Sequence, residues 1–180
     1  GTLGGSLTHS DPAGDMPGII LALKAELVVR GPSSQRTIGA DSFFIGTFET
    51  ALAPEELLTE IRLPLPTAHT GSSYMKLENK ASHYAITGCA TVLTLDSTGT
   101  CSAISVTITG ASIQTIRASA VEAALQGKKL DEATIADAAS HAADRMEMVA
   151  DIHGSANYRR QMTTVIAKRA LLKALERARA

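Results

Sequence analysis

The opening segment Thr2–Pro17 holds the densest group of residues that could bind a ligand. A pair of glycines at positions 4 and 5 is flanked by the hydroxyl residues Thr2 and Ser6. Because glycine has no Cβ, its backbone N–H groups can approach an anion closely, and neighbouring hydroxyls can donate to phosphate oxygens. Thr2–Ser6 is therefore a candidate cradle for a diphosphate, although a glycine pair taken alone is more often a plain structural turn.

The cysteine content limits the redox chemistry of the chain. Its two cysteines, Cys89 and Cys101, lie in predicted strands, where a small thiol packs well without reacting. No C-x-x-C and no H-x-x-x-H spacing occurs, so the sequence predicts neither a zinc site nor an iron–sulfur ligand set. Any redox work must therefore use an organic cofactor. Two reduced thiols also favour a cytoplasmic location.

Composition predicts a globular protein. With 180 residues, of which 44% are hydrophobic, the chain can bury a sizeable core and form one domain or two small ones. Seventeen basic and eighteen acidic residues give a net charge of -1, so the basic field that nucleic acid binding needs is missing. The apolar stretches, such as 18–23 and 86–95, are too short or too interrupted to span a membrane. No signal peptide is recognised.

The first part of the chain must position the opening segment. Its patterns predict a helix running into a strand at 19–30, a return strand at 36–39 and a helical turn at 40–42. Residues 57–63 alternate as a half-buried strand, with Leu57, Thr59, Ile61 and Leu63 on one aliphatic face. Proline, threonine, glycine and serine in 64–73 predict a linker between two domains.

The second part predicts strands followed by helices. The expected strands are 73–77, 84–95 and 101–109, and the expected helices are 116–126, 130–149 and a last one beginning at 154–155. The last helix carries one apolar stripe and a basic polar face. We expect that face to be solvated, and an acidic partner or membrane surface is the less favoured alternative.

Thr2–Pro17 resembles the second FAD-binding motif in the flavin subunits of molybdenum hydroxylases, the carbon monoxide dehydrogenase and xanthine dehydrogenase family. The matching positions are Thr2, Gly4, Gly5, Leu7, His9, Asp11, Pro12, Ala13, Asp15 and Pro17. The resemblance implies that the FAD diphosphate is held by Thr2, Leu3, Gly4, Gly5 and Ser6, and that Asp15 hydrogen-bonds the flavin nucleotide. Ser6 departs from the usual Asn or Asp, which weakens one expected hydrogen bond. His9 is expected to fix the loop.

Later phrases resemble the same family and follow its order. In 41–61 the resemblance implies that Leu58 lines the adenine side or the ring pocket, and a buried strand leucine is an equally good interpretation. In 73–85 it implies that Lys76 approaches the flavin and that Tyr84 lies behind the isoalloxazine ring. A flat tyrosine ring can stack on the isoalloxazine ring, and a cation beside the flavin favours its anionic reduced form. The alternative for both is a cross-strand surface residue.

The closing phrase Asp151–Arg159 also resembles the family, and we interpret Gly154 and Ser155 as a helix start with Tyr158 as a core anchor. The resemblance implies an α+β fold. Residues 1–66 would be the second part of a PCMH-type FAD-binding subdomain. Residues 67–180 would be a carboxy-terminal flavoprotein domain, with a three-stranded antiparallel sheet packed on a three-helix bundle.

The expected function is that of an electron-transfer component, an oxidoreductase subunit that passes electrons from iron–sulfur clusters through FAD to an external acceptor. Relatives carry an earlier A-G-G-x-[ST]-L loop that is not in this sequence, so we expect FAD to be shared with an amino-terminal segment missing here. Iron–sulfur and molybdopterin centres are expected on a small and a large partner subunit. Two alternatives are a docking module that does not bind FAD by itself and an oxidase of a related FAD fold.

Overall fold

The computed structural model describes every residue from Gly1 to Ala180 and shows a mixed α+β fold, as the sequence predicts. The elements follow in the order α1 (Leu3–His9), α2 (Asp15–Ala22), β1 (Glu26–Arg30), β2 (Gln35–Gly39), the 3-10 turn η1 (Ala40–Ser42), β3 (Phe44–Gly46), β4 (Glu49–Thr50), β5 (Leu57–Arg62), β6 (Thr70–Glu78), β7 (Ala85–Leu95), β8 (Cys101–Thr109), β9 (Ile116–Arg117), α3 (Ser119–Leu125), α4 (Glu132–Ser140) and α5 (Ala156–Arg179).

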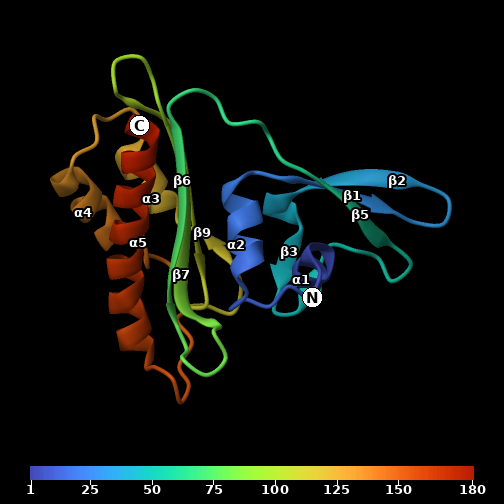
Figure 1. Ribbon diagram of the computed structural model, residues 1–180. Helices are drawn as coiled ribbons and strands as arrows, with labels where there is room; N and C mark the ends of the chain where they lie inside the picture. The colour runs from blue at the N-terminus through green and yellow to red at the C-terminus, as the bar shows by residue number, and fades with distance from the viewer.

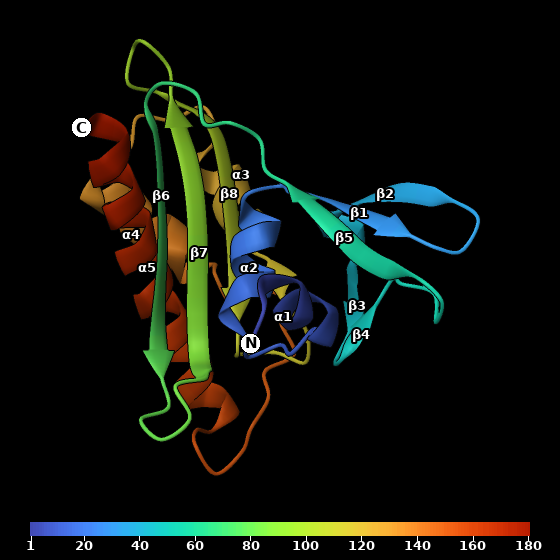
Figure 2. The same cartoon turned by 45° about the vertical axis from the view of Figure 1, so that its right-hand side comes forward.

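The largest sheet is antiparallel and has the strand order β6-β7-β8-β9. The turn between β7 and β8 closes with a hydrogen bond of 2.8 Å from the Asp96 amide to the Thr100 carbonyl. Gly99 in this turn has a φ of 78°, which favours glycine. Helices α3, α4 and α5 cover one face of the sheet, and α2 lies on the opposite face (Figures 1 and 2).

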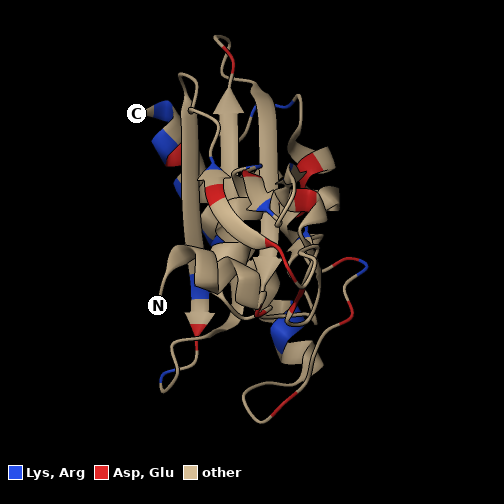
Figure 3. Cartoon of the chain, turned by 90° about the vertical axis from the view of Figure 1, so that its right-hand side faces the viewer, with Lys and Arg blue, Asp and Glu red and all other residues tan.

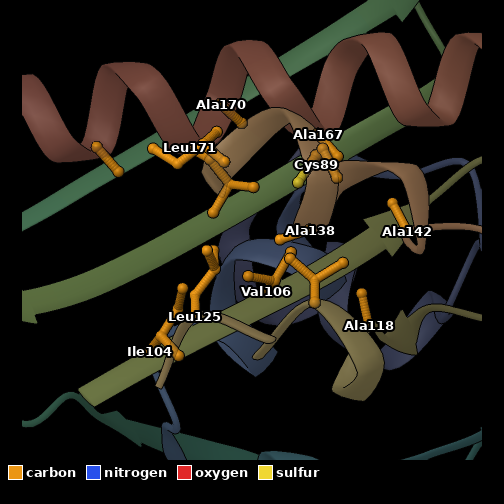
Figure 4. Close-up of a cluster of buried hydrophobic side chains, with 14 of the residues drawn as sticks. Cys89, Ile104, Val106, Ala118, Leu125, Ala138, Ala142, Ala167, Ala170 and Leu171 are labelled. Atoms are coloured by element: carbon orange, nitrogen blue, oxygen red, sulfur yellow. The ribbon is translucent and has the colours of Figure 1, made fainter. Parts of the chain in front are cut away.

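The main hydrophobic core lies between the sheet and the three carboxy-terminal helices (Figure 4). Alternate strand residues such as Leu93 point into it, because successive side chains on a strand face opposite ways. Helix α5 contributes Ala170, Leu171 and Ala174 at helical spacing. The alanines let the helix backbone approach β6 so closely that a Cβ at Gly71 would collide with backbone atoms of Ala174.

Both cysteines are free and lie in this core. Neither exposes any surface to solvent. Burial raises the pKa of the Cys89 thiol to about 12, and it also raises the pKa of Cys101. Because the thiolate is the reactive form of cysteine, we expect both residues to be unreactive and to serve in packing.

Helix α2 packs on the opposite face of the sheet through small and hydroxyl-bearing residues. Thr107 donates from Oγ1 to the Gly18 carbonyl at 2.7 Å. A Cβ at Gly18 would collide with the Thr109 side chain, so glycine is what allows this close approach. Arg117 of β9 adds hydrogen bonds to Asp41 (3.0 Å) and to the Leu21 carbonyl (3.3 Å). These contacts fix α2, which begins at the end of the opening segment.

The amino-terminal part has a second, smaller core. It contains an antiparallel sheet of order β2-β1-β5 and a two-stranded sheet of β3 and β4. Nine buried residues, including Leu7, Leu27 and Phe43, form its core under α1 and α2. Leu7 comes from the opening segment, so this core anchors α1 to the sheet.

The predicted aliphatic face of β5 is wrong. The pairing with β1 shifts register between Val28 and Val29, which leaves Thr59 without a partner. Such a bulge reverses the alternation of side chains. As a result Leu58 and Ile61 both pack on the small core, whereas Leu57 is 70% exposed.

Three other boundaries differ from the predicted ones. The sheet has four strands instead of three, because Ile116 and Arg117 pair with β8 before α3 begins. The second of the carboxy-terminal helices ends at Ser140 and not near Val149, and the chain then turns back so that Met148 bridges Ser112. Strand β6 begins at Thr70, inside the predicted linker.

Candidate functional site

The glycine pair of the opening segment lies in the first turn of α1. Thr2 is the N-cap, and its Oγ1 accepts a hydrogen bond of 3.0 Å from the Gly5 amide. The first amides of a helix have no acceptor within the helix, so those of Leu3 and Gly4 point outward. A Cβ at Gly4 would meet nothing within 4 Å, which means that packing inside this chain does not require glycine there. The open space beside Gly4, which is itself half-buried, fits close approach by another molecule or segment.

Asp15, the first residue of α2, joins the opening segment to the large sheet. It accepts hydrogen bonds from Tyr74 (2.7 Å) and from the ammonium group of Lys76 (2.9 Å). Lys76 also donates to the His83 carbonyl at 2.6 Å. Burial and the hydrogen bond to Asp15 raise the pKa of Tyr74, so its hydroxyl remains protonated. Asp15 and Lys76, both predicted to contact the cofactor, are therefore paired with each other. Through its bond to His83, Lys76 is also joined to the residue that precedes Tyr84.

A cleft of about 360 Å³ opens where the segment between α1 and α2 meets the start of β7 and the end of β8. Asp11, Pro12 and Ala13 form one wall, and Tyr84 stands in another. Tyr84 is 46% exposed, so nearly half of its surface is accessible to a ligand. Phe48 and Ile113, also large and exposed, add apolar surface. The size and the apolar lining are those of a small-molecule site.

Backbone hydrogen bonds hold the walls of this cleft together. The Gly110 amide donates to the Pro12 carbonyl (2.7 Å), and the Ala85 amide donates to the Ala13 carbonyl (3.2 Å). Gly110 has a φ of 76°, and a Cβ there would collide with Ala85. The opening segment is therefore fixed directly beside Tyr84, although 70 or more residues of chain separate Ala13 from it.

The other predicted site residues lie around the cleft or away from it. Gly4 and Gly5 do not line it, but His9 at the end of α1 packs on the Phe48 ring with centroids 4.9 Å apart. This contact supports the expectation that His9 has a structural role in the opening segment. Leu58 packs on the small core instead of lining the cleft, which is the alternative interpretation considered for it.

Several cleft residues were not predicted. Phe48 has a φ of 57°, which is unusual for a bulky residue and which no sequence signal marks. Asp151 and Arg159 line the cleft from the closing phrase, where only a structural role was expected. The resemblance of that phrase to the family was the signal that could have identified them.

Figure 3 shows basic positions at the carboxy-terminal end of α5, and several basic side chains of this helix contact neighbouring elements. Arg177 donates to the Ser72 carbonyl (2.6 Å), Arg179 to the Leu130 carbonyl (2.7 Å) and Lys168 to Glu132 (2.9 Å). These bonds join the last helix to β6 and to the α4 region. The structure therefore favours a structural use of this face over an acidic partner.

Comparison with known proteins places the chain in a family. Residues 1–66 match the FAD binding domain in molybdopterin dehydrogenase, and residues 72–174 match the CO dehydrogenase flavoprotein C-terminal domain. The chain therefore belongs to the FAD-binding medium subunits of molybdenum hydroxylases. No helix is long and apolar enough to cross a membrane.

Individual relatives agree with this assignment. The carbon monoxide dehydrogenase medium chain of Hydrogenophaga pseudoflava is 36% identical over 95% of this chain and 59% of its own length. The 6-hydroxypseudooxynicotine dehydrogenase complex subunit alpha of Paenarthrobacter nicotinovorans is 35% identical over 99% and 60%.

Solved structures give the same picture. Carbon monoxide dehydrogenase from Hydrogenophaga pseudoflava superposes with a TM-score of 0.93 and 40% identity, over 98% of this chain and 61% of that one. Quinoline 2-oxidoreductase from Pseudomonas putida 86 gives a TM-score of 0.90 and 30% identity, over 100% and 62%. The chain thus spans about 60% of the length of the curated relatives it matches.

Proposed function

We propose that this chain forms one side of an FAD site in a molybdenum hydroxylase and is part of its electron-transfer subunit. The observation that carries the proposal is the junction of two distant segments. The opening segment lines a cleft with Tyr84, and its Asp15 binds Lys76 beside that cleft. These are the segments that the family resemblance assigns to FAD.

The residues present fit the cofactor. The outward amides near Gly4 and the free hydroxyl hydrogen of Thr2 are donors suited to a diphosphate. Bound FAD would accept and release electrons one or two at a time. The exposed face of Tyr84 would stack on the flavin and exclude water from one side.

Lys76 would supply positive charge at the flavin. Its ammonium group donates to both carboxylate oxygens of Asp15 (2.9 and 3.2 Å) and to the His83 carbonyl (2.6 Å), and the Glu78 carboxylate lies 3.7 Å away. Because Asp15 carries the opposite charge 2.9 Å away, it orients Lys76 and also offsets part of its charge. We therefore assign to Asp15 a part in setting the charge at the flavin, besides its expected contact with the nucleotide.

The remaining parts of the FAD site and the other redox centres are proposed to lie outside this chain. The chain spans about 60% of its relatives, so a further segment can supply the other side of the diphosphate site. Iron–sulfur clusters and molybdopterin would be on a small and a large partner subunit. The two free thiols support a cytoplasmic location.

FAD binding by the chain and by a longer form that includes an upstream segment tests the proposal. We expect the longer form to be yellow and to bind FAD in a one-to-one ratio, and the chain alone to bind it weakly. A longer form that stays colourless with excess FAD would contradict the FAD proposal. That result would favour a docking module without FAD, for which the position of Gly4 and Gly5 outside the cleft is the supporting observation.

A substitution of Tyr84 gives the first prediction. In the longer form, Tyr84→Leu should weaken FAD binding by between about twofold and about tenfold, because ring stacking contributes roughly 0.5–1.5 kcal/mol beyond buried area. Fluorescence titration of FAD measures the change. Tyr158→Leu is the matched control, since Tyr158 does not line the cleft and is 40% exposed, which shows that the predicted core position of this residue is wrong. Equal effects of the two substitutions would contradict a stacking role for Tyr84.

A further inference from the structure

Arg159 is a buried charged residue near the start of α5, and the proposed function gives it no role. Only 3% of its surface is exposed, yet it lines the cleft. A guanidinium stays charged when it is buried, so protein hydrogen bonds must replace its water. Its contacts therefore identify the parts of the chain that depend on it.

The guanidinium of Arg159 joins three separate segments. One terminal nitrogen, Nη1, donates to the Ile86 carbonyl at the start of β7 (2.6 Å) and to the Gly110 carbonyl just after β8 (2.8 Å). The other, Nη2, donates to the carboxylate of Asp151 (2.6 Å). Asp151 is itself held in a turn, where its Oδ1 accepts from the His153 amide (2.8 Å).

The segments that Arg159 holds are the ones that hold the opening segment. The amide of Gly110 donates to Pro12, and Ala85, next to both Tyr84 and Ile86, donates to Ala13. Arg159 thus binds this junction on one side, and the Pro12 and Ala13 carbonyls bind it on the other. Both views of the fold show α5 beginning at the end of the sheet where β7 begins (Figures 1 and 2).

We propose that Arg159, held by Asp151, is a positioning residue of the FAD site: it sets the junction of β7, β8 and the opening segment and thereby the placement of Tyr84. This inference rests on the proposed FAD function. Arg159 is not expected to contact the flavin. It acts through backbone carbonyls that determine where the Tyr84 ring stands.

Stability alone does not explain this arrangement. The Nε atom of Arg159 is buried without a hydrogen-bond partner, and an unsatisfied buried donor is unfavourable. Well-packed apolar side chains often replace a buried ion pair without loss of stability. What an apolar residue cannot do is bind two carbonyls and a carboxylate at once, so the arrangement provides defined geometry.

The test uses the longer, FAD-loaded form and the substitution Arg159→Met. We expect FAD affinity to fall about tenfold, since a small misplacement of a site residue has effects of this size or larger. Flavin fluorescence should rise because Tyr84 no longer stacks in register, and the flavin midpoint potential should shift. Arg159→Lys keeps the charge and should restore part of each signal.

Arg160 provides the matched control. It is the next residue on α5 and donates to the Ala143 and Met146 carbonyls, on the helical side and away from the cleft. Arg160→Met should leave FAD affinity within about twofold of the wild type, as expected for a substitution outside the site. Equal changes in flavin fluorescence and potential for Arg159→Met and Arg160→Met would overturn the proposal.

A second variant, Asp151→Asn, tests the proposal even if Arg159→Met does not fold. Asp151→Asn keeps the oxygen that accepts from His153 but removes the charge opposite Arg159, and the Asp151 side chain is 45% exposed. It should change the flavin signals in the same direction to a smaller extent. Folded Asp151→Asn with wild-type affinity, fluorescence and potential would overturn the proposal. Absence of FAD from the wild type would instead overturn the proposed function.

Discussion

Glu56 shows how a single side chain can make stability depend on pH. Arg36 donates to both of its carboxylate oxygens, at 2.8 and 2.7 Å, and the Ala53 amide donates at 2.9 Å. The hydrogen bonds from Arg36 and Ala53 lower the pKa of Glu56 from 4.5 to about 2. The folded state therefore binds a proton at Glu56 less readily than the unfolded state does.

The sign of the pH effect follows from this lowered pKa. A carboxyl group with a lowered folded-state pKa contributes stability above its unfolded pKa, and this contribution is lost as pH falls through the folded pKa. We therefore predict that the free energy of unfolding falls between about pH 4.5 and about pH 2, and that Glu56→Gln reduces this fall. Urea unfolding across that range measures it. Glu55→Gln is the neighbouring control, and an equal effect there would contradict the prediction.

At the residue scale, the sequence identified the cleft only in part. The phrases that resemble the family mark Asp11 and Tyr84, which line the cleft, and Asp15, which lies beside it. The pairing of Asp15 with Lys76 could not be predicted, because it depends on where α2 lies on the large sheet. Phe48 enters the cleft through contacts that only the folded chain makes.

At the element scale, the close approach of β6 and α5 depends on Gly71. A Cβ there would collide with backbone atoms of Ala174 and Ala178, which cannot move without moving the helix. We predict that Gly71→Ala lowers the free energy of unfolding by about 2–3 kcal/mol, the upper part of the usual range of roughly 1–3 kcal/mol for overpacking. Denaturant unfolding measures this change.

Gly39→Ala is the control for this prediction. A Cβ at Gly39, in β2, would meet nothing within 4 Å, and the φ of Gly39 is -67°, which alanine adopts freely. It should change stability by no more than about 0.5 kcal/mol. If the two variants were equally stable, the packing of α5 on β6 would be looser than described.

Element prediction succeeded where local patterns are strong. The strands that became β7 and β8 and the start of α5 follow from hydrophobic runs, a glycine turn and the Ser155 cap. The short strand β9 was missed because two residues carry no periodicity, and their pairing with β8 is a tertiary contact. The face of β5 was wrong because a bulge opposite β1 leaves no mark in the sequence.

At the scale of the whole molecule, helix α2 connects the amino-terminal part of the chain to the large sheet of the carboxy-terminal part. The amino-terminal core of nine residues is small beside the carboxy-terminal core of 24. Helix α2 leaves the small core and lies on the large sheet, where Thr107 and Arg117 hold it. The proposed FAD site is formed nearby, where the segment that precedes α2 meets the ends of β7 and β8. Its geometry therefore depends on both parts being folded together.

Because Cys89 and Cys101 are buried, a cysteine introduced at the surface could be labelled selectively in the native chain. We predict that a maleimide probe modifies neither cysteine in the native state and both in denaturant. The mass of the intact protein measures the number of labels. Labelling in the native state would contradict the burial of the two thiols. A cysteine introduced at the exposed Ser82, on the rim of the cleft, would then be the single reactive thiol. A spin label or dye attached there would report on the approach of FAD and of partner chains without any background signal from the protein itself.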